Sequence, residues 1–228
     1  DRENMPDTKL ANTICYEELI SDESEDFQWP EFDENTASSL CYTSGTTGNP
    51  KGVLYSHRST ILHAWIVSSG NVAKVSSSSC ILPVVPMFHV NAWGIPYAGA
   101  MFGAKLVFPG PALDGASLFE LIDNEKPDLL MGVPTVWLGL LQHLRETNQT
   151  LDCVETALVG GSAAPRAMIQ EFEEEHDVFL MHGWGMTEMS PLGTATSRTK
   201  EMDNLDLEKR YDLSVSYTHL RAHETVSH

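Results

Sequence analysis

Positive charge is scarce in this sequence. The 228 residues contain 14 Lys and Arg side chains against 32 Asp and Glu, which gives a formal net charge of −18 at pH 7. Phosphate backbones and anionic lipid surfaces repel so acidic a chain, which argues against a nucleic-acid partner and an anionic-membrane partner. Residues 1–35 alone carry twelve acidic side chains against Arg2 and Lys9. We interpret them as an acidic N-terminal flank with a short helix near residues 16–20, and assign the flank no function.

Long apolar runs are also missing. No stretch of eighteen or more apolar residues occurs, so no transmembrane segment is expected. The chain starts at Asp1 rather than methionine, which predicts a fragment of a longer protein. Its start has neither the basic region nor the apolar region of a signal peptide, so no secretion signal is expected.

Cysteine is limited to four scattered residues. Cys15, Cys41, Cys80 and Cys153 do not have the spacing of metal ligands. Cys41 and Cys80 stand in apolar, strand-like stretches, where a buried reduced thiol is the usual state. A reducing, cytoplasmic location therefore fits the sequence best.

Short apolar runs alternate with helical patterns after residue 35. The apolar runs predict strands at residues 39–43, 52–55, 81–85, 105–108, 129–132, 154–159 and 178–181. Helical patterns fall at residues 56–69, 92–102, 117–124, 135–145 and 166–175. This alternation predicts an α/β domain over residues 36–213, with layered, largely parallel sheets flanked by helices.

The last fifteen residues, 214–228, do not continue this pattern. They show neither helical nor strand periodicity, and they contain three of the nine histidines, His219, His223 and His228. A metal site built from these histidines is one interpretation, but no packed element frames them. The segment resembles a translation of sequencing-adapter DNA joined to the reading frame. We therefore expect a non-native tail and a native sequence that ends near Asp212.

A loop rich in hydroxyls and glycines separates the first two predicted strands. Its hydroxyl, glycine and lysine residues are Thr43, Ser44, Gly45, Thr46, Thr47, Gly48 and Lys51. Glycines let backbone N–H groups face an anion, hydroxyls add donors and the lysine adds a mobile charge. Pro50 before the lysine and Gly52 after it distinguish the loop from the ordinary P-loop motif. The pattern favours polyphosphate binding over a plain surface turn.

Three segments, in this order, are similar to the adenylate-forming superfamily of acyl-CoA synthetases, luciferases and peptide-synthetase adenylation domains. The loop resembles the superfamily's phosphate-binding motif. Residues 160–165, Gly-Gly-Ser-Ala-Ala-Pro, resemble its nucleotide-contacting glycine turn. Residues 182–188, His-Gly-Trp-Gly-Met-Thr-Glu, resemble its adenine- and magnesium-binding motif. The resemblance implies that the chain is a central part of the large adenylating domain of such an enzyme.

The resemblance implies a reaction in two halves. A carboxylate attacks the α-phosphorus of ATP and expels pyrophosphate, and a thiol, usually that of coenzyme A, then displaces AMP. The implied cofactors are ATP and Mg²⁺, with coenzyme A as acceptor and a small-molecule carboxylic acid as substrate. Both steps move negative charge among phosphate oxygens, so catalysis would consist chiefly of positioning and charge stabilisation.

Residues around the nucleotide receive roles from the same resemblance. The loop from Thr43 to Lys51 would hold the β- and γ-phosphates, while Thr43 and Glu188 would belong to the magnesium shell. Thr187 would donate to the α-phosphate. Trp184 would stack on adenine, with an ordinary core tryptophan as the alternative. Further contacts with the nucleotide are implied for Gly161, Ser162, His182, Gly183, Gly185 and Met186.

The acid-binding side is implied by the sequence Pro-Met-Phe-His-Val-Asn-Ala-Trp-Gly, centred on Val90. It resembles the fatty-acyl-CoA synthetases, in which His89 would lie near the reacting carboxylate, Val90 would line the acyl pocket and Trp93 would gate it. Simple packing is the alternative for Trp93. Val133 and Thr135 would form another wall. The apolar content of these stretches suits a hydrophobic acid better than an amino acid.

The catalytic residues expected on this basis are Lys51, His89, Thr187 and Glu188. The leading hypothesis is a magnesium- and ATP-dependent fatty-acid–CoA ligase. This chain would be an incomplete and by itself inactive part of it, because the family's ribose-binding aspartate, hinge and C-terminal domain do not appear. The alternatives are an aryl- or other acyl-CoA ligase, a domain that loads a carrier protein, and a non-catalytic adenylate-binding remnant. A homodimer of the longer protein is compatible with the resemblance.

Overall fold

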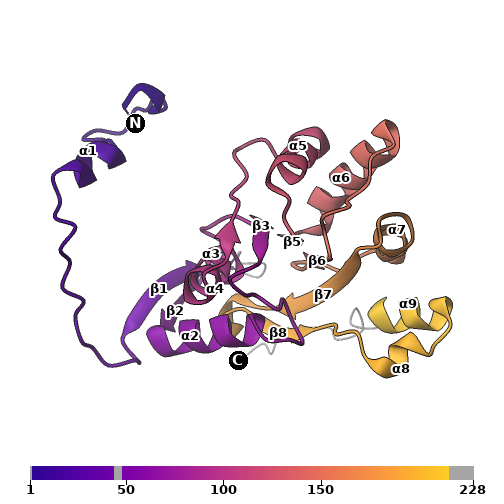
Figure 1. Cartoon of the computed structure of the whole chain (residues 1–228). Coiled ribbons are helices and arrows are strands. Elements are labelled where there is room, and N and C mark those ends of the chain that lie inside the picture. Colours follow the sequence, from indigo (N-terminus) through magenta and orange to yellow (C-terminus); the bar gives the residue numbers. More distant parts are fainter. Residues whose placement is uncertain (1, 44–47, 216–228) are drawn as a thin grey trace. The chain divides into compact units, whose positions relative to one another are not determined.

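The computed structural model of this chain describes residues 2–43 and 48–215 (Figure 1). They fall into two units, one that ends at Asp33 and one that begins at Glu34, and each is described by itself. Within the described ranges, no helix has both the length and the apolar character needed to cross a membrane.

The first unit has little regular structure. It contains a short 3-10 helix, Arg2–Asn4 (η1), and one α-helix, Tyr16–Ser21 (α1). The Arg2 guanidinium donates two hydrogen bonds to the Glu18 carboxylate. The short helix predicted near residues 16–20 is thus confirmed, but none of its residues is buried. So short and exposed a helix has little stability of its own in water.

A six-stranded sheet organises the second unit. Its order is β4–β3–β5–β6–β7–β8, and neighbouring strands are parallel except for β7 and β8. The strands are β3 (Cys80–Val84), β4 (Lys105–Leu106), β5 (Leu129–Gly132), β6 (Thr156–Val159), β7 (Phe179–Gly185) and β8 (Leu192–Ala195). The predicted α/β class with a parallel-rich sheet is therefore confirmed.

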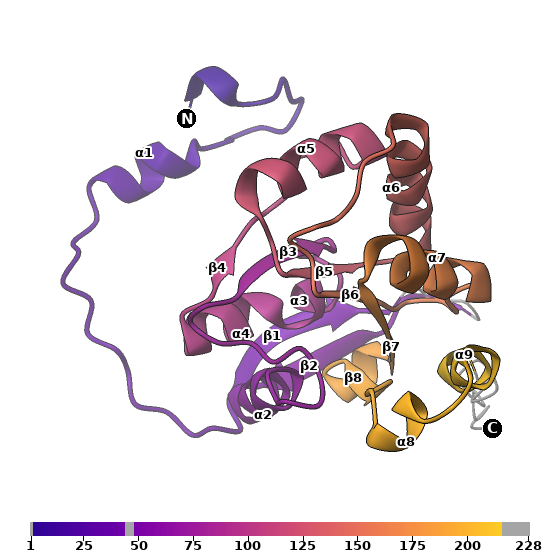
Figure 2. The same cartoon turned by 45° about the vertical axis from the view of Figure 1, so that its right-hand side comes forward.

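Helices cover both faces of this sheet (Figure 2). The core on one face receives side chains from α5 (Gly115–Glu125), α6 (Pro134–Thr147), α7 (Arg166–His176) and α9 (Leu207–Val215). The core on the other face receives them from α2 (His57–Val67) and α4 (Ile95–Phe102). Successive strand residues point to opposite faces, so Leu130 packs in the first core and its neighbours Leu129 and Met131 in the second.

An antiparallel hairpin precedes the sheet and carries the predicted phosphate loop, below called the phosphate loop, between its strands. It consists of β1 (Ala37–Tyr42) and β2 (Gly52–Ser56). The loop closes where the Thr43 N–H donates to the Lys51 carbonyl at 2.9 Å. Ser56 then caps α2, because its hydroxyl accepts from the Ser59 N–H while the Ser59 hydroxyl accepts from the Ser56 N–H. This capping box confirms the helix start predicted at Ser56.

The helix predicted over residues 92–102 is wrong at its start. The segment Val90–Trp93 (α3) has φ values of 44° to 56°, and Gly94 follows at 74°. These residues form a left-handed turn, and the right-handed helix α4 begins only at Ile95. A left-handed conformation costs about 1–2 kcal/mol for each L-residue. Tertiary contacts must therefore stabilise the left-handed conformation. The apolar pattern of the sequence does not predict such contacts.

The C-terminal part of the chain contains more structure than predicted. β7 continues to Gly185 rather than ending at residue 181, since its last residues pair with β8. Neither β8 nor the helices α8 (Lys200–Asp203) and α9 has a predicted counterpart. Gly, Thr and charged residues dominate these stretches and give weak strand and helix signals. Helix α9 passes Asp212 and ends at Val215, and the rest of the expected tail lies outside the described residues.

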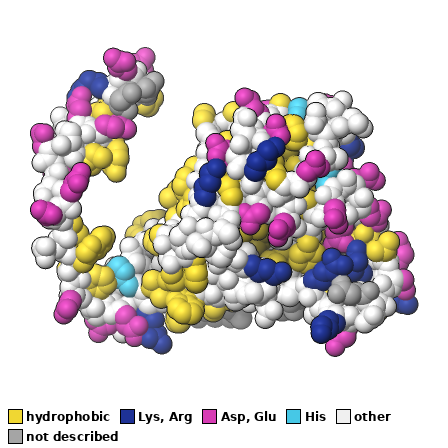
Figure 3. Space-filling view, in the orientation of Figure 1, with side chains coloured by type: hydrophobic (Ala, Val, Ile, Leu, Met, Phe, Trp, Pro, Cys, Tyr) yellow, Lys and Arg dark blue, Asp and Glu magenta, His cyan; other side chains and the backbone are white. Residues whose placement is uncertain are grey.

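Helix α2 carries apolar side chains toward solvent as well as toward the core. Ile61, Leu62, Trp65 and Ile66 are exposed. Figure 3 shows hydrophobic side chains gathered over α2 on the face in view. A gathering of this kind is typical of surfaces that contact another protein segment.

We predict a large difference in stability between two Leu→Ala variants. Leu130 is 0% exposed, so Leu130→Ala should lower the free energy of unfolding by about 2–5 kcal/mol through lost burial and a cavity. Leu138 on α6 is 48% exposed, and Leu138→Ala should cost less than about 1 kcal/mol. Urea unfolding measures both values. Equal losses would contradict the core described above.

Candidate active site

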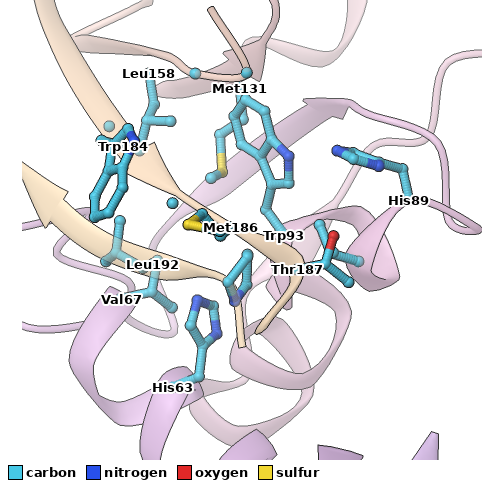
Figure 4. Close-up of a pocket in the computed structure, with 16 residues that line it drawn as sticks. His63, Val67, His89, Trp93, Met131, Leu158, Trp184, Met186, Thr187 and Leu192 are labelled. Atoms are coloured by element: carbon cyan, nitrogen blue, oxygen red, sulfur yellow. The ribbon is translucent and has the colours of Figure 1, made fainter. Parts of the chain in front are cut away.

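A cavity of about 200 Å³ lies at the carboxyl ends of the parallel strands β5, β6 and β7 (Figure 4). In open α/β sheets, ligands bind at this edge. The lining comes from α2, the left-handed turn, the three strand ends and the segment after β7. Its residues are His63, Val67, His89, Val90, Trp93, Met131, Leu158, Gly160, Gly161, Gly183, Trp184, Gly185, Met186, Thr187, Pro191 and Leu192.

Strand β7 brings most of the predicted nucleotide segment to the cavity. Five consecutive residues line it, namely Gly183, Trp184, Gly185, Met186 and Thr187. The Trp184 ring stands at one side of the cavity, and Met186 and Thr187 follow toward the opposite side, where His89 lies (Figure 4). These residues offer an aromatic face and a hydroxyl within one short segment, as binding of a nucleoside and its phosphate requires.

The chain turns sharply after this segment. The Met186 N–H donates to the Pro191 carbonyl at 3.0 Å, and Thr187–Met189 form a 3-10 helix, η2. Glu188 lies in η2, next to Thr187, and is exposed. Its carboxylate is therefore free to meet a cation that enters from solvent.

The left-handed turn brings the predicted acid-binding residues to the same cavity. His89, Val90 and Trp93 all line it, and the Trp93 ring occupies its centre (Figure 4). This ring lies against Gly160 at the end of β6, where a Cβ atom would be 3.1 Å from Trp93 Cη2. Glycine at this position therefore leaves space for the indole.

Asn91 fastens the left-handed turn to the loop hairpin. Its side-chain Nδ2 donates to Ser39 Oγ at 2.9 Å, and the Cys41 thiol donates to its side-chain Oδ1 at 3.7 Å. Asparagine also tolerates the left-handed conformation better than most residues. Val90 packs with Cys41 and Tyr55 in a small core. These contacts offset the conformational cost of the turn.

The rest of the cavity is mainly apolar, and the sequence analysis did not identify its residues. They are Val67, Met131, Leu158 and Leu192, from α2, β5, β6 and β8. A further lining residue, His63 of α2, is 6% exposed and reaches into the cavity from below (Figure 4). A Cβ atom at Gly94 would lie 2.5 Å from His63 Nδ1, so the imidazole depends on that glycine for its place.

A signal for His63 does exist in the sequence. The buried residues of α2 are Thr60, His63, Ala64 and Val67, the spacing of one helical face. A histidine on that face is either a core residue or a cavity residue, and only the position of the neighbouring strands decides between them.

A sequence profile of the AMP-binding enzymes matches residues 2–219, nearly the whole chain. The chain belongs to this family. The resemblance to adenylate-forming enzymes is thereby confirmed.

Curated relatives of this AMP-binding chain are named as CoA ligases. It is 53% identical to the 3-methylmercaptopropionyl-CoA ligase of Ruegeria lacuscaerulensis over 87% of this chain and 37% of the relative. It is 51% identical to the medium-chain-fatty-acid–CoA ligase of Ectopseudomonas oleovorans over 91% of this chain and 38% of the relative. The chain thus spans less than two fifths of the length of these relatives.

Solved structures share the fold. An anthranilate CoA ligase in complex with anthranoyl-AMP superposes with a TM-score of 0.74 at 20% identity, over 84% of this chain and 37% of that one. The N-terminal domain of FACL13 from Mycobacterium tuberculosis superposes with a TM-score of 0.70 at 27% identity, over 79% and 44%. Both likenesses agree with the α/β architecture described above.

Some of the predicted site residues do not line the cavity. His182 is buried within β7, where burial lowers the pKa of its imidazole and a hydrogen bond to the Ser162 backbone opposes that shift. Ser162 itself is exposed beyond the lining. Val133 lies next to Gly161: a Cβ atom placed on Gly161 would be 3.3 Å from Val133 Cγ1. Thr135 is exposed at the start of α6 and forms no wall of this cavity.

The phosphate loop is described only at its base. The Lys51 N–H donates to Thr43 Oγ1 at 3.1 Å, and this bond accompanies the backbone pair that closes the loop. Lys51 and Gly48 are exposed. The predicted phosphate contacts Ser44, Gly45, Thr46 and Thr47 lie outside the described residues.

The donor set suits a magnesium ion bound together with a nucleotide. Across residues 2–43 and 48–215, no three His, Cys, Asp or Glu side chains gather as a protein-only metal site. Magnesium, however, commonly uses one or two carboxylates and completes its shell with water and substrate phosphates. One exposed carboxylate, Glu188, beside the hydroxyl of Thr187 meets that requirement.

His63 is neutral at physiological pH. Burial lowers the pKa of its imidazole to about 4 from the ordinary value of 6.5. A neutral ring can donate one hydrogen bond and accept another. His63 therefore adds a polar contact to the apolar part of the cavity without adding charge.

We predict that His63 makes the protein less stable in mild acid. Between pH 6.5 and pH 4 the unfolded chain binds a proton at this residue that the folded chain does not, so unfolding becomes easier as the pH falls. The contribution at pH 4.5 should be about 2–3 kcal/mol. His63→Gln should lose correspondingly less stability than the wild type between pH 7 and pH 4.5 in urea unfolding. The same loss in both proteins would contradict the buried neutral state.

Proposed function

We propose that the full-length protein containing this chain is an ATP-dependent acid–CoA ligase that activates a fatty acid. The proposal is supported above all by one observation. The cavity is lined both by the acid-side turn, with His89 and Trp93, and by the nucleotide segment that ends at Thr187. An acid bound along the first and an α-phosphate bound at the second would be neighbours, as acyl-adenylate formation requires.

The first half-reaction would proceed by in-line displacement. A carboxylate oxygen of the acid forms a bond to the α-phosphorus of ATP, and the bond between that phosphorus and the pyrophosphate oxygen breaks. Lys51 would stabilise the leaving pyrophosphate by its charge, and Thr187 would donate to an α-phosphate oxygen. His89 would orient the attacking carboxylate by hydrogen bonding.

Glu188 and Thr43 would hold the magnesium ion. The ion, when bound, neutralises charge on the phosphate oxygens. Glu188 follows Thr187 directly, so a metal held there would lie beside the reacting phosphate. In the second half-reaction the coenzyme A thiolate attacks the acyl carbon, and AMP leaves with the electron pair of the broken bond.

The cavity favours a hydrophobic acid. Val67, Met131, Leu158 and Leu192 supply an apolar surface, which stabilises an alkyl chain in proportion to the area buried. Relatives named for medium-chain and long-chain fatty acids support this substrate class. Fatty-acid metabolism in the cytoplasm is the setting that we propose, in line with four free cysteines.

A second candidate is a short acid that carries a thioether. Two relatives, 53% and 49% identical, are named 3-methylmercaptopropionyl-CoA ligases. The neutral His63 would offer such an acid a hydrogen bond that a plain alkyl chain cannot use. Aryl acids, carrier-protein loading and adenylate binding without turnover are the remaining alternatives.

Pyrophosphate exchange with the full-length protein separates these substrates. Octanoate, palmitate, 3-methylmercaptopropionate, benzoate and leucine would be compared by kcat/KM. We expect an alkanoate to rank first. A higher rank for 3-methylmercaptopropionate would favour the second candidate, and a higher rank for benzoate or leucine would contradict both. Saturable binding of ATP without any exchange would favour the non-catalytic alternative.

We predict that Glu188→Ala slows adenylation by about 100-fold or more while leaving the fold intact, because a metal ligand at the reacting phosphate is lost. Exchange rates over a range of magnesium concentrations test this prediction, and circular dichroism tests the fold. Glu175→Ala, which removes an exposed carboxylate at the end of α7, serves as the matched control. A magnesium dependence identical to that of the wild type would remove Glu188 from the metal shell.

A further inference from the structure

One side chain joins the phosphate-loop hairpin to the nucleotide segment. Tyr55 of β2 is 5% exposed, and its hydroxyl donates to the backbone carbonyl of Thr187, 132 residues further along the chain. The Ser190 N–H donates to the same carbonyl at 3.4 Å and closes η2. Tyr55 therefore reaches the backbone of the turn that carries both Thr187 and Glu188.

The Tyr55 ring also touches the acid side of the cavity. It packs with Cys41 of β1 and with Val90 of the left-handed turn, and Trp93 packs against this cluster. The tyrosine thus contacts the hairpin, the acid-side turn and the nucleotide turn at once. Its ring accounts for the packing, while its hydroxyl accounts only for the bond to Thr187.

The chemistry of this bond demands a neutral donor. A backbone carbonyl can only accept, so a phenolate could not take the place of the phenol. Burial, followed by the neighbouring Cys41 thiol and the charge of Glu188, raises the pKa of Tyr55 above its ordinary value of 10. The hydroxyl therefore keeps its proton, and the bond persists throughout the physiological range of pH.

The route from this bond to the phosphate loop is short. Lys51 lies four residues before Tyr55, and β2 begins at Gly52, immediately after the lysine. The base of the loop is held by two bonds between Thr43 and Lys51. A shift of the turn relative to β2 would consequently change the distance between the lysine and the residues expected to bind the α-phosphate and magnesium.

We propose that Tyr55 is a positioning residue. Its hydroxyl fixes the strand that follows Lys51 against the turn that carries Thr187 and Glu188. Lys51 and these two residues thereby meet the same triphosphate. This inference rests on the proposed function. It concerns the first half-reaction alone, because pyrophosphate has left before coenzyme A reacts.

The test is Tyr55→Phe in the full-length protein, which removes the hydroxyl and keeps the ring. We expect the KM for MgATP in pyrophosphate exchange to rise about three- to tenfold, the effect that one lost buried hydrogen bond produces. The KM for the acid, and the rate of thioester formation from supplied acyl-adenylate, should change less than about twofold. A merely structural role would lower the melting temperature and leave the KM for MgATP unchanged.

Tyr42→Phe is the matched control. Tyr42 lies on the paired strand of the same hairpin but is 61% exposed, so loss of its hydroxyl should leave all three quantities at the wild-type values. A second readout uses the Lys51→Ala background. If Tyr55 acts by aligning the lysine, Tyr55→Phe should raise the KM for MgATP of the Lys51→Ala protein by less than about twofold.

Four results would overturn the inference. The first three concern Tyr55→Phe alone: an unchanged KM for MgATP, an equal effect on both half-reactions, or loss of the folded state, which would make Tyr55 a core residue only. The fourth is a full additional effect in the Lys51→Ala background. Failure of the proposed function looks different. In that case the wild type itself would show no MgATP-dependent pyrophosphate exchange with any acid.

Discussion

The parallel pairing of β5, β6 and β7 determines where binding can occur in this chain. Because these strands run in the same direction, their carboxyl ends meet at one edge, and glycine stands at or just beyond each end: Gly132, Gly160 and Gly185. A Cβ atom at Gly132 would lie 2.7 Å from Trp137, and one at Gly160 would lie 3.1 Å from Trp93. At these two glycines, aromatic rings from other segments approach the backbone. The cavity lies at the same edge.

The segments that complete the cavity come from outside the sheet and depend on one another. Four consecutive L-residues in a left-handed turn cost several kcal/mol in total. Asn91 and Val90 of this turn contact the hairpin, at Ser39, Cys41 and Tyr55. The hairpin also reaches the nucleotide turn through Tyr55. A strained backbone at a binding site is maintained only where its surroundings determine it fully. Here the hairpin determines the acid side and the nucleotide side together.

The sequence predicted the sheet and its helices well, because buried strands such as β5 and capped helices such as α2 carry strong local signals. Motifs singled out residues 183–187 and the residues His89, Val90 and Trp93, which the structure brings to one cavity; their roles stay predictions. The sequence could not predict the left-handed turn, since an apolar run that ends in Gly-Ile-Pro is equally compatible with a helix. His63 and Leu192 were missed because they reach the cavity only through tertiary packing, and His182, though within the motif, is buried and does not line the cavity.

Charge explains how so acidic a protein could accept the carboxylate substrate that we propose. None of the described residues that line the cavity is Asp, Glu, Lys or Arg, although the chain carries 32 acidic side chains. The proposed carboxylate substrate would therefore meet no charged side chain among these residues, and the imidazole of His89 would be available to orient it. The same lack of a carboxylate disfavours an α-amino acid, whose buried ammonium group would have no counter-charge. The neutrality of the cavity thus supports a simple carboxylic acid over an amino acid as the proposed substrate, while the apolar side chains around it support an acid with a hydrophobic chain.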